Sequence, residues 1–412
     1  MPRSTESADA PRSNPDLLAR LLRGIDRELP AAIELRHRLH AQPELAHAEH
    51  RTAETIAAAL PVTAQAAAGT GLIARVGPAD GPAVALRAEL DGLPIHELTG
   101  ASFSATGDAM HACGHDVHMA ALVALARAAH ILGEEPRAGG GEGLPAALLT
   151  VFQPSEEAYP SGAEQLAHGE LAALAPAAVV AAHIHPQLPW GAVALDAGAV
   201  NASCDAVEIT VEGEPTHGAY PHHGRDPILA IAQIVVALHA LLARRIDPHA
   251  PVVLTVGVIE GGSAENVIPS RARARAALRA YRPEDRRELA RMVQEVVSGI
   301  AAAHGCRGLV ELVPGEPALQ NDAAIVGRAR ALLADAGLAP APEWRSSGSD
   351  DFAFFGALAP LAMAFVGLDG AEGFQARPLH HPELLVPDAA VGAVARAQAV
   401  LYVAAAAEHA RG

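Results

Sequence analysis

Short, uninterrupted runs of apolar residues, bounded by glycine and proline, recur through the first half of the chain. They cover residues 71–76, 83–86, 146–152 and 178–183. Apolar runs of this length are typical of strands that are buried on both faces of an α/β sheet. Each of the last three runs is followed by acidic or histidine residues, and open α/β sheets bind ligands at that end of their strands. The pattern therefore predicts an α/β domain with a site at one edge of its sheet.

Helical periodicity fills the chain on either side of these runs. Residues 16–29 and 31–40 predict two helices separated by Pro30, which lacks the N–H that a helix interior needs. Residues 117–132 predict a buried helix rich in alanine, leucine and valine, and residues 389–409 predict a long Ala-rich helix. We therefore expect helices to flank the sheet.

The pattern changes in the middle of the chain. Four strand-like segments there alternate with two amphipathic helices in the order βαββαβ, which is that of a ferredoxin-like module. The change of pattern divides the chain into a disordered tail, an α/β domain that carries the candidate site, and an inserted module. We predict these parts at residues 1–14, at 15–200 with 315–412, and at 201–314.

The composition excludes several classes of function. The net charge of −17 argues against nucleic acid as a partner. Lysine is absent from the 412 residues, which excludes Schiff-base chemistry and a P-loop lysine. Cys113, Cys204 and Cys306 are odd in number and widely spaced, which favours reduced thiols and a cytoplasmic location. We expect no secretory signal, because the segment through Pro15 is polar and no apolar h-region follows it. We expect no membrane span, because no apolar run approaches about 18–20 residues.

The chemically richest segment is 111–118, which reads His-Ala-Cys-Gly-His-Asp-Val-His. It offers three imidazoles, a thiol and a carboxylate where a loop enters the predicted buried helix. Cys113 and His115 are close enough to serve one metal centre, because borderline and soft metal ions bind thiolate and imidazole together. The alternative is that the histidines cap the helix and the cysteine packs in the core.

Eight short motifs lie along the chain, at 87–94, 111–118, 152–157, 183–186, 222–227, 261–269, 348–352 and 379–382. Together and in this order they resemble the co-catalytic metallo-amidohydrolases of the aminoacylase/carboxypeptidase superfamily. The similarity is to the branch of hippurate hydrolases, N-acyl-amino-acid amidohydrolases and auxin-conjugate amidohydrolases. It implies a catalytic α/β domain whose mixed, mostly parallel sheet is flanked by helices, interrupted by a ferredoxin-like dimerisation or lid domain.

The resemblance implies two divalent metal ions per chain. Cys113 would bridge them as a thiolate, His115 and Glu157 would complete one centre, and His183 and His380 would complete the other. Thiolate and imidazole ligands favour zinc, whereas carboxylate and water ligands also suit manganese, cobalt or nickel. His183 could instead be a core histidine, and His380 is preferred to the histidine after it because it follows the family's leucine.

The resemblance also implies the catalytic and substrate-binding residues. Glu156 would be the general base, taking a proton from a metal-bridging water and passing it to the leaving amine. His217 would polarise the scissile carbonyl, often from the partner subunit in this family. Asn266 and Arg271 would contact the substrate carboxylate, which arginine matches with two parallel hydrogen bonds.

Asp91 and Asp116 are predicted to contact the metal ligands rather than the metals, with Asp116 orienting a ligand imidazole. Each of these roles has an ordinary alternative. Asp116 could simply complement the dipole at a helix start, and the two adjacent glutamates could form a solvated edge. His217 could be a loop histidine without a role, and Arg271 could belong to the wet face of a strand.

These predictions favour a cytoplasmic two-metal amidohydrolase that cleaves N-acyl amino acids, such as hippurate or N-acetyl amino acids, and forms a homodimer or higher homo-oligomer. One alternative is a dipeptidase or aminopeptidase of the same superfamily, which would need an acidic group to hold a free α-ammonium. Another is a metal-stabilised binding protein without catalysis. A serine hydrolase using Ser349 is also conceivable, although the chain lacks the G-x-S-x-G nucleophile elbow.

Overall fold

The structure of the protein, a computed structural model, describes residues 15–134 and 143–407. The chain forms two compact units. The first comprises the chain up to Gly198, Gln320–Trp344 and Phe354–Gly412, and the second comprises Ala199–Leu319 and Arg345–Ala353. The predicted tail lies outside the described residues. Residues Arg345–Ala353 cluster with the second unit, although the sequence pattern had assigned them to the α/β domain.

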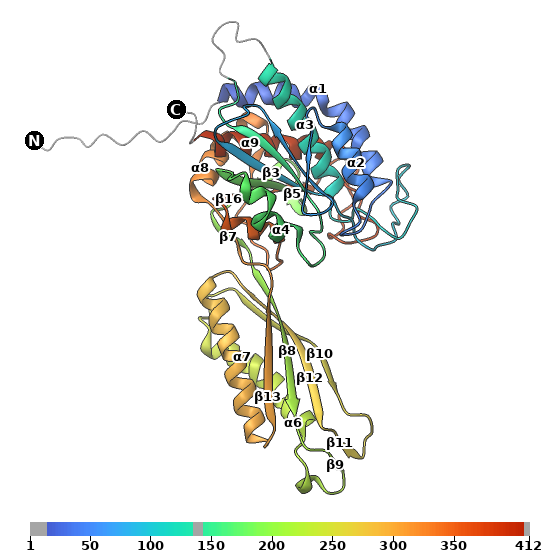
Figure 1. Ribbon diagram of the computed structural model, residues 1–412, viewed down its shortest axis with the longest axis vertical. Helices are drawn as coiled ribbons and strands as arrows, with labels where there is room; N and C mark the ends of the chain where they lie inside the picture. Colours follow the sequence, from blue (N-terminus) through green and yellow to red (C-terminus); the bar gives the residue numbers. More distant parts are fainter. Residues whose placement is uncertain (1–14, 135–142, 408–412) are drawn as a thin grey trace, which may run out of the picture. The chain divides into compact units, whose positions relative to one another are not determined.

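An eight-stranded mixed sheet forms the centre of the first unit (Figure 1). Its strand order is β1-β2-β4-β3-β5-β16-β6-β15, and four of its seven pairings are parallel. The central strands β4, β3, β5 and β16 are parallel and largely buried, as the uninterrupted apolar runs predicted. The strands are β1 (Gln65–Ala67), β2 (Gly71–Val76), β3 (Ala83–Glu89), β4 (Ala147–Gln153), β5 (Ala178–Pro189), β6 (Ala192–Ala194), β15 (Ala339–Pro340) and β16 (Leu361–Asp369).

Helices α3 and α9 pack against this sheet, and α1 packs on both of them (Figure 1). Helices α3 and α9 are buried nearly all round because they consist mainly of alanine, leucine and valine, so they form the middle of the core. The helices of this unit are α1 (Pro15–His40), α2 (His50–Ala59), α3 (His115–Glu134), α4 (Gly162–His168), α5 (Glu170–Ala173), α8 (Ala323–Leu332) and α9 (Ala389–Ala406).

The prediction of two helices separated by Pro30 is wrong, because α1 is continuous and contains this proline. Pro30 removes one backbone hydrogen bond and costs about 3 kcal/mol. Leu17 and Leu21 before it and Leu35 after it are all buried in the same core. Burying each leucine is worth about 1.5–3 kcal/mol, so packing on both sides of the proline keeps the helix whole.

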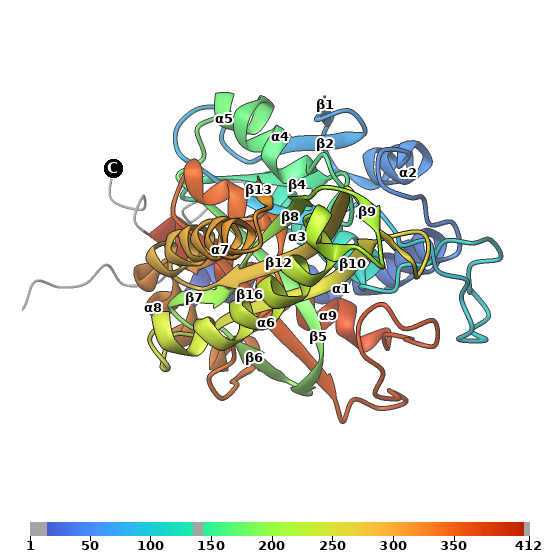
Figure 2. The ribbon, with the colours of Figure 1, turned by 90° about the horizontal axis from the view of Figure 1, so that it is seen from below.

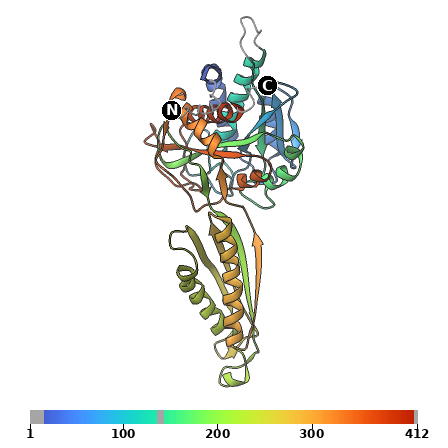
Figure 3. The same cartoon turned by 90° about the vertical axis from the view of Figure 1, so that its left-hand side faces the viewer.

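The second unit is a four-stranded antiparallel sheet packed against two helices, α6 and α7, which run side by side (Figures 2 and 3). Its chain order is βαββαβ and its strand order is β10-β12-β8-β13, which confirms the predicted ferredoxin-like module. Strand β12 alternates exposed arginine with buried alanine because only one face of the sheet is covered. The elements are β8 (Ser203–Glu212), β9 (Thr216–His217), α6 (Pro227–Arg245), β10 (Val252–Gly261), β11 (Val267–Ile268), β12 (Arg271–Ala280), α7 (Pro283–Ala303) and β13 (Arg307–Pro314).

Two short strands, β7 (Gly198–Asn201) and β14 (Leu319–Asn321), lie where the chain passes from the first unit to the second and back. Short 3₁₀ helices complete the described structure, at Pro221–His223, Ala334–Ala336 and Asp351–Ala357.

Candidate metal centre

The candidate site lies where neighbouring parallel strands of the first unit end. Glu89 is the last residue of β3, Glu156 follows the end of β4, and His183 lies within β5. Strand β3 stands between β4 and β5 in the sheet. His115 is the first residue of α3, which packs against β3. Side chains that are far apart in the sequence therefore meet at the edge of the sheet that the strand pattern indicated.

The structure brings the five predicted metal ligands together. Cys113 Sγ, a ring nitrogen of His115 and a carboxylate oxygen of Glu157 lie within 4.8 Å of one another. Cys113 Sγ is 3.5 Å from His183 Nε2, and Glu157 Oε1 is 3.2 Å from His380 Nε2. Thiolate, imidazole and carboxylate groups thus converge from four separate parts of the chain.

His380 is held next to the cysteine segment by the backbone. Its φ of 65° is in the left-handed region, and its N–H donates to Ala112 O at 2.9 Å. The neighbouring His381 uses its Nδ1 to accept the N–H of Glu383 at 3.1 Å. The geometry therefore favours His380 over His381 as the ligand, which is the choice made from the sequence.

The two buried ligand histidines are each oriented through Nδ1. His115 Nδ1 donates to Asp91 O at 2.8 Å, and His183 Nδ1 donates to Ile184 O at 2.6 Å. A carbonyl oxygen can only accept, so Nδ1 carries a ring proton and Nε2 is the nitrogen left to bind a metal or a second proton. This arrangement is the one that orients a histidine for a metal, because the ring is fixed and its free nitrogen faces the other ligands.

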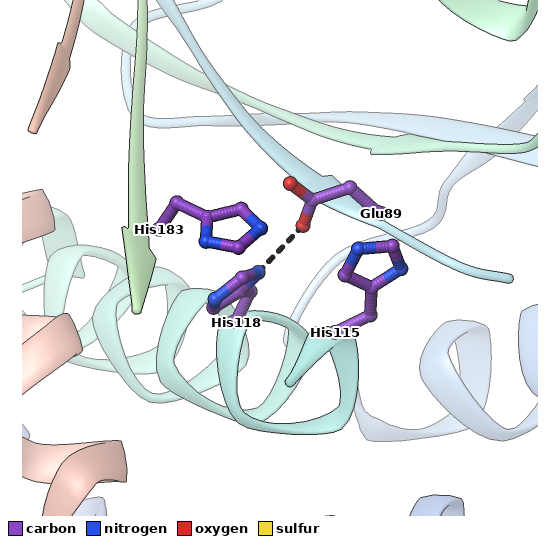
Figure 4. A group of neighbouring side chains, drawn as sticks. All are labelled: Glu89, His115, His118 and His183. Atoms are coloured by element: carbon purple, nitrogen blue, oxygen red, sulfur yellow. Dashed lines mark hydrogen bonds and ion pairs between the residues drawn. The ribbon is translucent and has the colours of Figure 1, made fainter. Parts of the chain in front are cut away.

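A second group of donors, formed by Glu89, His115, His118 and His183, lies beside the first (Figure 4). His118 Nε2 accepts the N–H of Ile184 at 3.0 Å, so its Nδ1 must donate to Glu89 Oε2, which is 2.8 Å away. Both ring nitrogens of His118 are therefore occupied, and it has no lone pair left for a metal. It supports the strand that carries His183 instead of binding a metal.

The electrostatic field of the site favours a positive charge. Burial alone would lower the pKa of His115, but Glu89 and Asp91 outweigh it and raise the pKa to about 10. Burial alone would raise the pKa of Glu89, yet Arg87 and the nearby histidines hold it well below its usual range. Burial holds the pKa of His183 far below the usual range, so this imidazole is neutral and able to bind a metal.

The residues present fit divalent cations. Among the described residues, His115 Nε2 and Glu157 Oε1 are buried and have no hydrogen-bond partner, although a buried polar atom normally has one. His380 Nε2 and Glu157 Oε1 approach each other without making a hydrogen bond, as two ligands of one ion would. A donor set that adds a carboxylate to thiolate and imidazole is more typical of catalytic than of closed structural sites.

Glu156 lies beside these ligands. Its Oε2 is 3.9 Å from His115 Nε2, whereas the carboxylate of Glu157 is directed to His380. The two adjacent glutamates thus point to different partners. Ser155, which precedes them, has a φ of 50°, a left-handed conformation that is uncommon for any residue other than glycine.

Buried Glu49 and exposed His47 hold Ser155 in this conformation. Glu49 Oε1 accepts the N–H of Ser155 at 2.8 Å, and Glu49 Oε2 accepts the hydroxyl of Thr70 at 2.6 Å. Ser155 Oγ accepts the N–H of His47 at 2.9 Å and lies 2.9 Å from His47 Nδ1. These bonds offset the roughly 1–2 kcal/mol that the left-handed conformation costs. They therefore fix the backbone before Glu156 and, with it, the direction in which the Glu156 side chain projects.

The two predicted supporting carboxylates differ in what they contact. Asp91 contacts two predicted ligands, because its carbonyl accepts His115 Nδ1 and its Oδ2 accepts the N–H of Glu157 at 2.9 Å. The bonds of Asp116 go instead to Arg36 and His40, both at 2.9 Å. Burial would raise the pKa of Asp116, but the charges of Arg36 and His40 hold it well below its usual range. Asp116 therefore anchors α1 to the start of α3, whereas we predicted that it would orient a ligand imidazole.

The other predicted residues belong to the second unit. His217 is exposed in β9, and its Nδ1 accepts the N–H of Ala219 at 3.0 Å. The carbonyl of Asn266 accepts the N–H of Gly218, and Arg271 is 3.7 Å from Glu212 on the neighbouring strand. Their roles toward a substrate therefore stay predictions.

The residues that hydrogen-bond Asp116 and Ser155 were not predicted from the sequence. Arg36, Glu49 and His47 all lie in the first fifty residues, and none belongs to a motif that suggested chemistry. The sequence carries no signal for them, because charged residues are ordinary in helical segments, and only the structure shows that Arg36 and Glu49 are fully buried. Charged side chains are almost never fully buried unless they are paired or hydrogen-bonded.

Known proteins share most of this chain. Residues 85–402 match the sequence profile of Peptidase family M20/M25/M40. The chain is 35% identical over 368 residues to N-acetyl-L-cysteine deacetylase of Bacillus subtilis, which covers 87% of this chain and 84% of that one. It is 31% identical over 377 residues to N-acetyldiaminopimelate deacetylase of Bacillus licheniformis, which covers 89% of this chain and 96% of that one.

The fold is also shared with a solved structure. The YXEP protein of Bacillus subtilis, a dinuclear metal-binding peptidase of the M20 family, matches with a TM-score of 0.79 and 28% sequence identity. The match covers 92% of this chain and 98% of that chain. These similarities confirm the family resemblance that the eight motifs indicated.

Proposed function

Since the chain belongs to Peptidase family M20/M25/M40 and is a hydrolase of amide bonds, we propose that it cleaves N-acyl amino acids at a two-metal site with Glu156 as the general base. One observation carries the proposal. The sulfur of Cys113, the free ring nitrogens of the ligand histidines and the carboxylate of Glu157 converge directly beside Glu156.

The residues of this chain divide the reaction between them. Divalent ions held by Cys113, His115, Glu157, His183 and His380 would polarise the scissile carbonyl and lower the pKa of the attacking water. Glu156 takes one proton from that water as its oxygen bonds to the carbonyl carbon, and returns the proton to the nitrogen as the C–N bond breaks. The products are a carboxylate and a free amino acid. We assign the hydrogen bond to the carbonyl oxygen to His217, and contacts with the substrate carboxylate to Asn266 and Arg271.

A substrate panel tests this function. The two deacetylases that match the chain are named for N-acetylated amino acids, so N-acetyl-L-cysteine, N-acetyldiaminopimelate and hippurate are compared with the dipeptides Ala-Ala and Cys-Gly. We expect kcat/KM for the best N-acyl substrate to exceed that of the dipeptides by at least about 100-fold, because a site built for a neutral acyl group leaves an α-ammonium unpaired. Faster cleavage of dipeptides would identify a peptidase. Two bound metals without cleavage of any substrate would identify a binding protein.

The contact of Glu49 with Ser155 gives a specific prediction. We expect Glu49→Ala to lower kcat by about 10–100-fold while KM changes less than threefold, because a displaced catalytic group loses rate rather than substrate affinity. The variant should also be about 1–3 kcal/mol less stable, since the N–H of Ser155 and the hydroxyl of Thr70 lose a buried acceptor. Steady-state kinetics and urea unfolding measure the two effects.

Thr70→Val is the matched control for Glu49→Ala. It removes a hydrogen bond from the other oxygen of the same carboxylate and leaves the bond to Ser155 in place. We expect it to lower stability and to keep kcat within about twofold of the native value. Equal losses of kcat in both variants would mean that Glu49 stabilises the fold without positioning Glu156.

We also propose that the protein is a homodimer joined through α6 and β10. Within residues 15–134 and 143–407, three helices are long and apolar enough to cross a membrane by length and composition, but α3 and α9 are largely buried within the first unit. Only 28% of the corresponding window of α6 is buried in this chain. Leu229 and Val236 on α6 are 51% and 70% exposed, and β10, which packs against α6, is an edge strand. A second copy of the same surface would cover this apolar helix face and pair the open strand edge.

Replacing Val236 with glutamate tests the dimer. A charge in the centre of an apolar interface cannot be paired, so we expect Val236→Glu to be monomeric at 10 µM while the native protein is dimeric. Light scattering coupled to size exclusion measures the mass. Val313→Glu is the control, because Val313 is 52% exposed on β13 at the opposite edge of the same sheet. A native monomer of about 42 kDa would reject this interface.

The metal and the location follow from the same chemistry. We propose zinc, because a thiolate and several imidazoles are the ligands it prefers, with manganese, cobalt or nickel as alternatives. We propose a cytoplasmic location because Cys113, Cys204 and Cys306 are free thiols and Cys113 must stay reduced to bind a metal.

A further inference from the structure

A pocket of about 390 Å³ in the first unit is lined by the end of α1, by one side of α2 and by Arg127 of α3. Its polar lining consists of Arg38, Gln42, Arg51, Thr52, Thr55 and Arg127. None of these residues belongs to the metal centre. Among the described residues that line the pocket, none is acidic, although the whole chain carries a net charge of −17. Three guanidinium groups therefore share one concave surface without a carboxylate in its wall.

The hydrogen bonds of the three arginines leave donors available to the pocket. Arg51 Nε donates to Glu44 Oε1 at 3.1 Å, while Arg127 Nε donates to Ala59 O at 2.8 Å and its NH1 donates to Glu28 at 3.3 Å. Arg38 makes no ion pair with any residue in the described ranges 15–134 and 143–407. In the part of the chain that the structure describes, the three arginines therefore have only two carboxylate partners, Glu44 and Glu28. The N–H donors of the Arg38 guanidinium stay available to bind a ligand.

Each arginine comes from a different helix. Arg38 lies in the last turn of α1, Arg51 in the first turn of α2, and Arg127 within α3. The backbone of Arg127 is fixed by a buried helix, and its bond to Ala59 O holds the guanidinium at the end of α2. The packing of the helices therefore fixes the backbone positions from which the three arginines extend, although the side chains of Arg38 and Arg51 are themselves exposed.

We propose that this pocket binds a compact dianion, either a phosphate group or the paired carboxylates of a small dicarboxylic acid. Guanidinium groups match both, because their planar N–H forks bind two oxygens of phosphate or carboxylate at once. Such a ligand would bridge α1, α2 and α3 through Arg38, Arg51 and Arg127. It would not be a substrate of the metal centre, since no lining residue of the pocket is a predicted metal ligand or base.

The test is titration calorimetry of the full, metal-loaded chain with inorganic phosphate and, separately, with succinate, at constant ionic strength set by sodium chloride. We expect one or both to bind at one site per chain and to raise Tm. In Arg38→Gln we expect binding to weaken at least about tenfold, which corresponds to the loss of one charge-assisted contact of roughly 1.4 kcal/mol. Binding of phosphate alone or of succinate alone would then identify the kind of dianion.

Arg23→Gln is the matched control. Arg23 is an exposed arginine on the same helix α1 and does not line the pocket. The proposal requires that Arg23→Gln bind like the native chain and that Arg38→Gln retain the native hydrolytic activity and Tm without anion. Equal affinity in the native chain and Arg38→Gln would place the anion elsewhere, including at the metals, and would reject the pocket. Absence of binding of both anions at concentrations up to about 20 mM would reject it too.

Discussion

Replacing Glu156 with glutamine is expected to lower kcat for N-acyl amino acids by at least about 10³-fold while both metal ions stay bound. The amide of glutamine has the shape of the carboxylate but cannot take a proton from water, and general acid–base catalysis contributes about 10²–10⁴-fold. Glu156 lies beside the ligand group, and its Oε2 is 3.9 Å from His115 Nε2. Initial rates together with elemental analysis of the same sample measure activity and metal content.

Glu164→Gln provides the matched control for this experiment. Glu164 is an exposed residue in the first turn of α4, eight positions after Glu156. It loses the same charge and should keep native kcat. The assignment of Glu156 as the base is rejected if Glu156→Gln retains full turnover with metal bound. Loss of activity accompanied by loss of metal would make Glu156 a ligand instead.

Removing the metals is expected to abolish hydrolysis and to lower Tm by roughly 5–10 °C. Ions present at about 100 times their dissociation constant add about 2.7 kcal/mol to the stability of the folded state. Chelation also leaves His115 Nε2 and Glu157 Oε1 buried without partners among the described residues. Differential scanning calorimetry and activity assays before chelation, after it, and after adding zinc back test both effects.

The cysteines provide an internal control for the metal prediction. Cys113→Ala should bind fewer metal ions and lose activity. Cys113 Sγ is 3.5 Å from His183 Nε2, and it also lies within 4.8 Å of ligand atoms of His115 and Glu157, so it can contact both predicted metal centres. Cys306→Ala removes a half-buried thiol of the second unit and should keep both metals and full activity. Undiminished hydrolysis by a chain freed of metal would disprove the two-metal mechanism.

The sequence predicted the parts of the fold that depend on local pattern. The apolar run at residues 71–76 coincides with β2, and the alternation of arginine and alanine coincides with β12. Both signals are strong because each face of such a strand is either buried or exposed along its whole length, so the pattern of apolar residues repeats without interruption. The prediction for α1 was wrong because it considered only the low helix propensity of Pro30, which is a local property. The packing of α1 on α3 and α9 keeps the helix continuous, and this packing involves residues that are distant in the sequence.

The candidate site was predictable only as far as its own motifs reached. The thiol of Cys113 and the imidazole of His115 predict a metal site from their chemistry alone. The family resemblance adds Glu157, His183 and His380 to the predicted ligands. Glu49 gave no such signal, because its function is to accept hydrogen bonds from a backbone turn formed more than a hundred residues later. A contact of that kind depends on the folded path of the chain, which no local pattern records.

The order of strands in the first unit has a consequence for synthesis on the ribosome. Strand β16 stands between β5 and β6 in the sheet, yet the whole second unit is made between these strands and β16. The second unit is almost continuous in sequence and can fold while the first still lacks β16, α9 and His380. A nascent chain therefore lacks part of the predicted ligand set until the segment after the second unit has been made, so we expect hydrolysis to begin only once β16 and His380 have left the ribosome.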